Sequence, residues 1–141
     1  MGEAVSVLAY PVIQFSQDHL EIVHDDTALR RCTRAGVRNG WYDGLLIVDC
    51  SLRRWPATLV GTRADRIVGW LTGRLIADLE LDRPETVELE DVRQRTQEIL
   101  QQQADLWDAD GQLDLRLQAV RRADDIRHLI DVLQTNDPSC S

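Results

Sequence analysis

Asp49 and Cys50 directly follow an apolar run, Leu45 to Val48, and the end of a buried strand is a common position for a nucleophile. A cysteine thiol acts as a nucleophile only with a base in hydrogen-bond reach, and His19 or His24 would have to supply that base. One hypothesis is therefore a small hydrolase-type enzyme that uses Asp49 and Cys50 with a histidine. The competing interpretation is a buried thiol and an exposed histidine on a turn.

Metal ligands are few and scattered. The segment from Asp108 to Gly111 is similar to part of a calcium loop, but Leu106 and Leu117 would then occupy its first and last ligand positions. Apolar side chains cannot supply those oxygen ligands, so a simple turn leading into a strand is favoured. No Cys-x-x-Cys pair suggests a zinc site either. We therefore expect no metal; the available soft ligands are Cys32, Cys50, Cys140, His19, His24 and His128.

All 16 basic residues are arginines, because the sequence contains no lysine. This composition excludes a P-loop lysine, a kinase-type lysine and a Schiff-base lysine within the chain. Neither a G-x-G-x-x-G dinucleotide motif nor a G-x-S-x-G nucleophile elbow occurs. We therefore expect no cofactor.

The formal net charge of -8 conceals an uneven distribution. Residues 1–29 carry five acids and no base, whereas residues 30–74 carry nine arginines and three acids. Residues 75–115 then carry twelve acids and three arginines. An isoelectric point near 4.8 makes nucleic acid an unlikely partner, because nucleic-acid binding needs a basic field.

The basic part of the chain begins with four arginines on or just after one predicted short helix: Arg30, Arg31, Arg34 and Arg38. Arginine forks suit carboxylates and phosphates, so an anion-binding domain is a second alternative function. The competing interpretation is a solvated face, or pairing with the acidic segments of the same chain.

The acidic part includes four candidate partner-binding residues: Glu85, Glu88, Glu90 and Asp91. Acids at the start of a helix complement its dipole, and they can also steer a basic protein toward fast association.

Two large aromatics, Trp41 and Tyr42, lie between Asn39-Gly40 and Asp43-Gly44. Because tryptophan and tyrosine dominate binding hot spots, this loop is a candidate interface anchor. Alternatively, one of the two rings plugs the core.

Apolar periodicity predicts the strands that would position these residues. Val12 to Phe15 and Leu20 to Val23 predict a hairpin. The continuous run Leu45 to Val48 predicts a central strand covered on both faces. Trp55 to Val60 is its predicted partner, and Pro56 indicates an edge.

Helical spacing predicts a short helix from Thr27 to about Ala35, with Asp25 or Asp26 as its N-cap and Gly36 as its end. Glu88 to Leu106 is the clearest helix, with apolar residues at i, i+3 and i+4 spacing.

Two further segments are less uniform. Residues 65–82 suit either one helix or a short helix to Leu71 followed by a strand from Arg74 to Leu81. Alternation predicts a half-buried strand from Leu113 to Ala119, and Asp124 would cap a last helix that runs to about Leu133.

Together these elements predict one α+β domain of the α/β class over residues 1–135, with a flexible polar tail at 136–141. The sheet is expected to be mixed and mostly antiparallel, with about five strands and about four helices. Segments Pro11 to Phe15, Leu20 to Val23, Leu46 to Asp49 and Leu113 to Leu133 resemble a small bacterial domain family of unknown function. The resemblance implies a fold and no activity.

The function that the sequence favours is a non-enzymatic protein–protein interaction module, similar in kind to an immunity or inhibitor protein. Its partner would be a protein, and a basic one by charge. An odd number of cysteines and an acidic N-terminus without a signal-peptide pattern predict a cytoplasmic location. No apolar run is long enough for a membrane span, so no membrane partner is expected.

Overall fold

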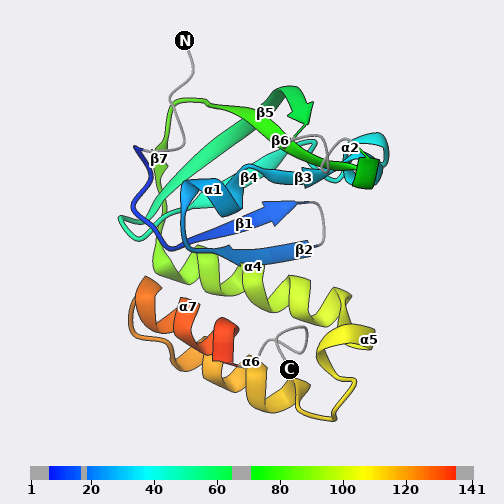
Figure 1. The fold of residues 1–141 in the computed structure, drawn as a ribbon. Coiled ribbons are helices and arrows are strands. Elements are labelled where there is room, and N and C mark those ends of the chain that lie inside the picture. The colour runs from blue at the N-terminus through cyan, green and yellow to red at the C-terminus, as the bar shows by residue number, and fades with distance from the viewer. Residues whose placement is uncertain (1–6, 17–18, 65–70, 136–141) are drawn as a thin grey trace.

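The computed structural model describes residues 7–16, 19–64 and 71–135. These form an α+β domain whose helices α4 to α7 lie together on one side of a curled sheet (Figure 1). The strands are β1 (Val12–Ser16), β2 (His19–Val23), β3 (Arg31–Thr33), β4 (Leu45–Val48), β5 (Arg53–Ala64), β6 (Arg74–Leu81) and β7 (Glu85–Thr86). The helices are α1 (Asp26–Leu29), α2 (Arg34–Arg38), α4 (Leu89–Gln102), α5 (Ala104–Trp107), α6 (Leu113–Arg122) and α7 (Ile126–Thr135).

The sheet has the order β2-β1-β4-β5-β6-β3, with β7 paired to β5. Each of these pairings is antiparallel, which confirms the mostly antiparallel sheet, although the parallel pair expected of a mixed sheet does not occur among the described strands. The described residues form seven strands and six helices, more than the sequence patterns predicted. The additional elements are short: β3 spans 3 residues and β7 spans 2, too few for a recognisable alternation.

Both faces of the sheet are covered, and this explains its continuous apolar runs. In β4, Leu45 and Ile47 belong to a core inside the curl, whereas Val48 faces a second core shared with the helices. Successive residues of a strand point to opposite faces, so a doubly covered strand requires apolar residues at every position. The prediction of a central strand at this run is confirmed, because β4 lies between β1 and β5.

The predicted helix from Thr27 to Ala35 is wrong in part, because α1, β3 and α2 divide that segment. The N–H of Ala77 donates to the Arg30 carbonyl, and the N–H of Arg34 donates to the Gly73 carbonyl. Pairing along β6 therefore overrides the local helical pattern. Asp25 caps α1 as predicted, but Gly36 lies buried inside α2 rather than ending a helix.

The predicted strand from Leu113 to Ala119 is also wrong, because this segment belongs to α6. Leu117 and Val120 enter the helical core, while Leu115, which alternation would bury, is 59% exposed. Three leucines at every second position match a strand, but Leu113, Leu117 and Val120 also lie on one face of a helix.

Three smaller predictions differ from the structure: the cap of the last helix, the position of Pro56 in the sheet and the end of the long helix. Asp125, not Asp124, caps α7, since its Oδ1 accepts from the His128 N–H at 2.7 Å. Pro56 lies in an interior strand rather than an edge, and its carbonyl accepts from the Asp82 N–H at 2.8 Å. The long predicted helix ends at Gln102, and α5 follows it as a separate turn.

The ambiguous stretch from 65 to 82 contains the strand β6, so its second half follows the helix-plus-strand alternative. Residues 65–70, including Trp70, and the predicted tail at 136–141 lie outside the described residues. Among the described helices, none is both long and apolar enough to span a membrane.

Candidate functional site

The aromatic loop between α2 and β4 is held by its backbone. The N–H of Trp41 donates to the Gly36 carbonyl at 3.0 Å, and the N–H of Asp43 donates to the Gly40 carbonyl at 3.2 Å. Gly40 and Gly44 have φ values of +75° and +67°, which favour glycine. The two Gly-containing pairs seen in the sequence therefore fix the turns on either side of Trp41 and Tyr42.

Gly36 forms the surface on which both aromatic rings pack. A Cβ atom at this position would lie 2.9 Å from Tyr42 Cε2 and 3.0 Å from Trp41 Cε3. Thr33 caps α2 by accepting from the Gly36 N–H at 3.0 Å, and the Thr33 N–H donates to the Tyr42 hydroxyl at 3.3 Å. Tyr42 thus occupies a backbone donor of the edge strand β3, which limits pairing with other strands there.

Substitution of Gly36 by alanine should therefore displace both rings. The shift is expected to cost about 1–3 kcal/mol in the free energy of unfolding, despite the better helix propensity of alanine. Urea unfolding and the indole N–H resonance of Trp41 would measure the two effects. Gly61→Ala is the matched control, because a Cβ at Gly61 would meet only an ordinary contact of 3.7 Å to Asp78 Oδ2. A G36A protein with wild-type stability and an unmoved Trp41 resonance would contradict this packing.

The two aromatic residues have different environments. Tyr42 packs against the core inside the curl, and burial raises the pKa of its hydroxyl. Trp41 is 55% exposed. Tyr42 therefore plugs the core, as the alternative interpretation predicted for one of the two rings, while Trp41 remains at the surface, where its role as an interface anchor stays a prediction.

Trp41 and Tyr42 border a cavity of about 510 Å³, which we call the aromatic pocket. Its other lining residues are polar side chains from β1, β2 and the end of α4: Gln14, Ser16, His19, Glu21 and Gln103. Residues 14 and 21 are opposite one another in the β1–β2 register. The volume lies within the range of ligand-binding sites, about 300–1,000 Å³.

Gln14 is an unusual residue for its position. It is only 9% exposed, in a strand whose neighbours Ile13 and Phe15 are buried in the helical core. No hydrogen bond joins its side-chain amide to another residue in the described part of the chain. We did not predict Gln14, Glu21 or Gln103 as site residues. The signal for Gln14 was a single polar residue within the apolar run of β1.

The four arginines predicted as one patch lie on three elements. Arg30 is the half-buried C-cap of α1, Arg31 lies on β3, and Arg34 and Arg38 begin and end α2. Arg31, Arg34 and Arg38 are exposed. The interruption of the predicted helix by β3 separates these residues, and none of them lines the aromatic pocket.

The four predicted acidic residues lie on β7 and the start of α4. Glu85 forms an ion pair with Arg54, and Glu90 Oε2 lies 2.8 Å from Arg93 Nη2. Glu88 is the N-cap position of α4, although its side chain makes no capping hydrogen bond. None of the four lines the aromatic pocket, so the acidic residues and the aromatic loop form separate regions.

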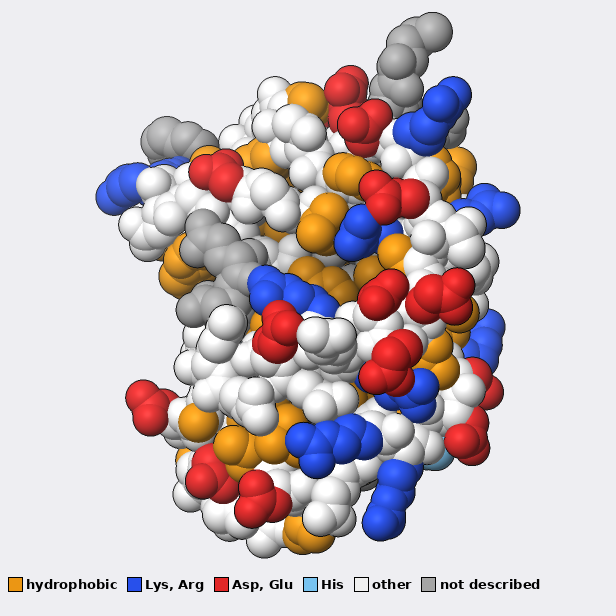
Figure 2. Space-filling model, turned by 180° about the vertical axis from the view of Figure 1, so that it is seen from behind, with side chains coloured by type: hydrophobic (Ala, Val, Ile, Leu, Met, Phe, Trp, Pro, Cys, Tyr) orange, Lys and Arg blue, Asp and Glu red, His pale blue; other side chains and the backbone are white. Residues whose placement is uncertain are grey.

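Asp91 lines a second hollow, of about 400 Å³, between the sheet and α4. Its floor is apolar, with Phe15, Leu46 and Val48, and Arg54 and Arg95 also border it. Figure 2 shows the rear face of the molecule, on which basic and acidic side chains surround hydrophobic ones. Arg54 pairs with Glu85 and Arg95 Nη1 lies 3.4 Å from Glu98 Oε2, so the arginine charges here are matched by acids of the same chain.

Asp49 is a buried structural acceptor. It is 1% exposed, and its carboxylate accepts from Ser51 Oγ at 2.6 Å and from Trp55 Nε1 at 3.1 Å. It also accepts from the backbone N–H groups of Ala9, Ser51 and Arg53. These five donors hold the N-terminal segment and the β4–β5 turn to one carboxylate.

Cys50 packs against the helical core, and its thiol donates to the Pro11 carbonyl at 3.1 Å. Burial raises the pKa of this thiol, which keeps it protonated and poorly nucleophilic at neutral pH. His24 lies at the end of β2, where its Nε2 is 2.8 Å from Gln134 Nε2. This arrangement lends the enzymatic hypothesis no support.

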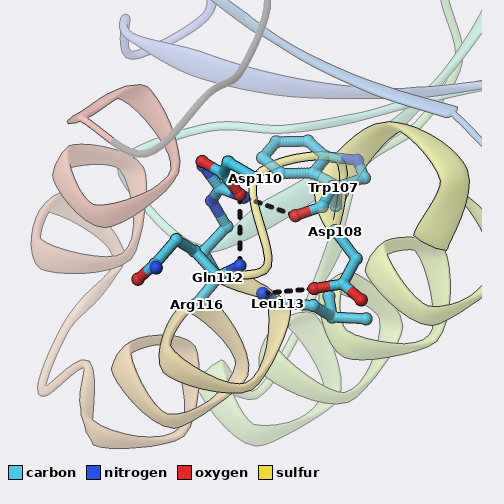
Figure 3. A network of polar contacts seen from close by, with 6 residues as sticks. All are labelled: Trp107, Asp108, Asp110, Gln112, Leu113 and Arg116. Atoms are coloured by element: carbon cyan, nitrogen blue, oxygen red, sulfur yellow. Dashed lines mark hydrogen bonds and ion pairs between the residues drawn. The ribbon is translucent and has the colours of Figure 1, made fainter.

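The loop from Asp108 to Gly111 is closed by Arg116, which the sequence patterns did not identify. Arg116 Nη1 and Nη2 donate to the two oxygens of Asp110, each at 2.8 Å (Figure 3). Asp108 Oδ1 accepts from the Leu113 N–H at 3.1 Å. Both acids are thus bound within the loop, which leads into a helix rather than the predicted strand. No group of three metal-ligating side chains occurs among the described residues.

No protein-family model, curated protein or solved structure significantly matches this chain. The resemblance to a small bacterial domain family therefore stays a prediction.

Proposed function

We propose that this chain is a non-enzymatic protein-interaction domain, immunity- or inhibitor-like in kind and cytoplasmic, which binds a basic protein partner through its aromatic loop. The observation that carries this proposal is the exposure of Trp41. More than half of this large ring faces solvent, although Gly36 and the flanking turns hold the loop in one position.

A fixed, exposed tryptophan suits an interface anchor for two reasons. Burying its apolar surface on association is favourable, and little conformational entropy is lost when the ring is already held. Tryptophan is also among the residues enriched at binding hot spots. The cavity beside Trp41 offers a recess into which a partner side chain could insert.

Charge supports a basic partner. The net charge of -8 would accelerate encounter with a basic protein, and this acceleration should weaken as salt is added. The acidic residues Glu85, Glu88, Glu90 and Asp91 lie away from the aromatic pocket, so we assign them to steering rather than to contact.

Affinity capture with wild-type protein and with Trp41→Ala tests the proposal. We expect a basic protein to be retained stoichiometrically by the wild type, and its affinity to fall at least about tenfold with W41A. Leu115→Ala is the control, because Leu115 is also an exposed apolar residue but lies on α6. A partner retained equally by W41A, or an association rate unaffected by salt, would contradict the proposed surface or the steering.

A further inference from the structure

The aromatic pocket contains two side chains with acceptor oxygens, Glu21 and Gln14, that have no hydrogen-bond or ion-pair partner among the described residues. Glu21 is an exposed residue that lines the cavity, and it forms no ion pair with any residue that the structure describes. Gln14, nine-tenths buried, likewise lacks a hydrogen bond to the described residues and faces the same space. The Gln14 amide is not among the fully buried side-chain groups that lack a partner, so it carries no burial penalty, and no described residue competes with a ligand for it.

The charge of the lining selects a cation. Among the described lining residues, Glu21 is the only aspartate or glutamate, and none is an arginine. The arginines of α2 belong to the helix beneath the loop and do not line the pocket. An anion would meet an uncompensated carboxylate there, whereas a cation would neutralise it.

The aromatic rings select the kind of cation. A guanidinium group is planar and weakly hydrated, so it stacks on tryptophan and tyrosine faces more readily than an ammonium group does. It also presents several N–H donors in a fork that suits a carboxylate and, beside it, an amide oxygen. Trp41 and Tyr42 are the aromatic residues of the lining, Glu21 its carboxylate, and Gln14 one of its amides.

We propose that the aromatic pocket binds the guanidinium group of an arginine side chain on the partner protein, with Glu21 as the ion-pairing residue and Trp41 as the stacking residue. This inference rests on the proposed function, since it names the partner chemistry at the same loop. The cavity of about 510 Å³ has room for a whole arginine side chain.

Titration with N-acetyl-arginine amide, followed at the Trp41 indole N–H by NMR, tests the pocket directly. We expect saturable binding, with Kd on the order of 1 mM for so small a ligand. The corresponding lysine amide should bind about tenfold more weakly, because an ammonium lacks the planar fork. Equal binding of the two amides would overturn the assignment to guanidinium.

Two variants and a matched control complete the test. Glu21→Gln and Trp41→Leu should each weaken arginine-amide binding about tenfold or more. Glu80→Gln, which removes an exposed carboxylate from β6, should leave it unchanged. Binding that E21Q does not weaken would overturn the proposal, because the affinity would then not come from an ion pair with Glu21.

Failure of the guanidinium assignment can be distinguished from failure of the proposed function. If a protein partner depends on Trp41 but arginine amide does not bind, the guanidinium assignment fails and the interaction function stands. If arginine amide binds as described but no protein is retained through Trp41, the function fails and the pocket is a site for a free guanidinium compound. In that case the partner named here is overturned as well.

Discussion

Replacing Asp49 with alanine is expected to destabilise the protein by about 4 kcal/mol or more, enough to unfold a marginally stable domain. The substitution would leave five donors without their acceptor: the Trp55 indole, the Ser51 hydroxyl and three backbone N–H groups. Each buried donor left unsatisfied costs about 1–3 kcal/mol, and some of these would recover water at the partly exposed turn.

Asp49→Asn provides the graded comparison. An asparagine oxygen can replace Oδ1, which accepts from the Ser51 and Arg53 N–H groups, but its NH2 group cannot accept from Trp55 or Ala9. D49N should therefore lose about half as much stability as D49A. Ser51→Ala removes only the hydroxyl donor and should cost about 1 kcal/mol.

Urea unfolding of the three variants would measure this order. A D49A protein with a wild-type unfolding midpoint would contradict the structural role of Asp49. A catalytic activity lost in D49N without loss of stability would revive the enzymatic hypothesis.

The parts of the fold that could be predicted are those in which one local pattern had one structural solution. The run from Leu45 to Val48 is apolar throughout because both faces of β4 are covered. The helix α4 repeats buried residues at Val92, Thr96, Ile99 and Leu100, a spacing that no strand shares. In each case local preference and tertiary environment agree.

The errors occurred where two solutions shared one pattern. Leucines at 113, 115 and 117 alternate as in a strand, and only the packing of Leu117 and Val120 on α4 and α7 selects the helix. β3 could not be predicted because its hydrogen bonds go to β6, more than forty residues later. Tertiary pairing of this kind leaves no local signal.

The candidate site was predicted only at its rim. Trp41 and Tyr42 were identifiable from their types and from the turns around them, whereas the floor of the pocket comes from β1, β2 and the end of α4. Gln14 and Gln103 are ordinary polar residues until the fold places the end of α4 beside the strand β1 of the curled sheet. The curl depends on long-range strand order, which periodicity does not encode.

Replacing Arg116 with alanine is expected to cost about 2–4 kcal/mol in the free energy of unfolding. Arg116 is 7% exposed, its Nη1 also donates to the Trp107 carbonyl, and its guanidinium lies 6.0 Å from the Trp107 ring centroid. Truncation leaves a buried carbonyl without a donor and removes the aliphatic stem from the α5–α6 corner. Arg121→Ala is the control on the same helix, because Arg121 is exposed and its Nε bonds only Gln97 among the described residues.

The same pair predicts a pH dependence whose sign follows from Asp110. Its hydrogen bonds from Arg116 hold the pKa of the Asp110 carboxyl below its ordinary value of 3.8. A carboxyl with a lowered folded-state pKa contributes stability above its unfolded pKa, and that contribution is lost as the pH falls through the folded pKa. The stability difference between wild type and R116A should therefore narrow in acid, and NMR titration should show the Asp110 pKa rising in R116A. An Asp110 pKa that stays low without Arg116 would mean that the backbone N–H groups of Gln112 and Asp110 are enough to hold the carboxylate. The loop would then be closed independently of the helix that follows it.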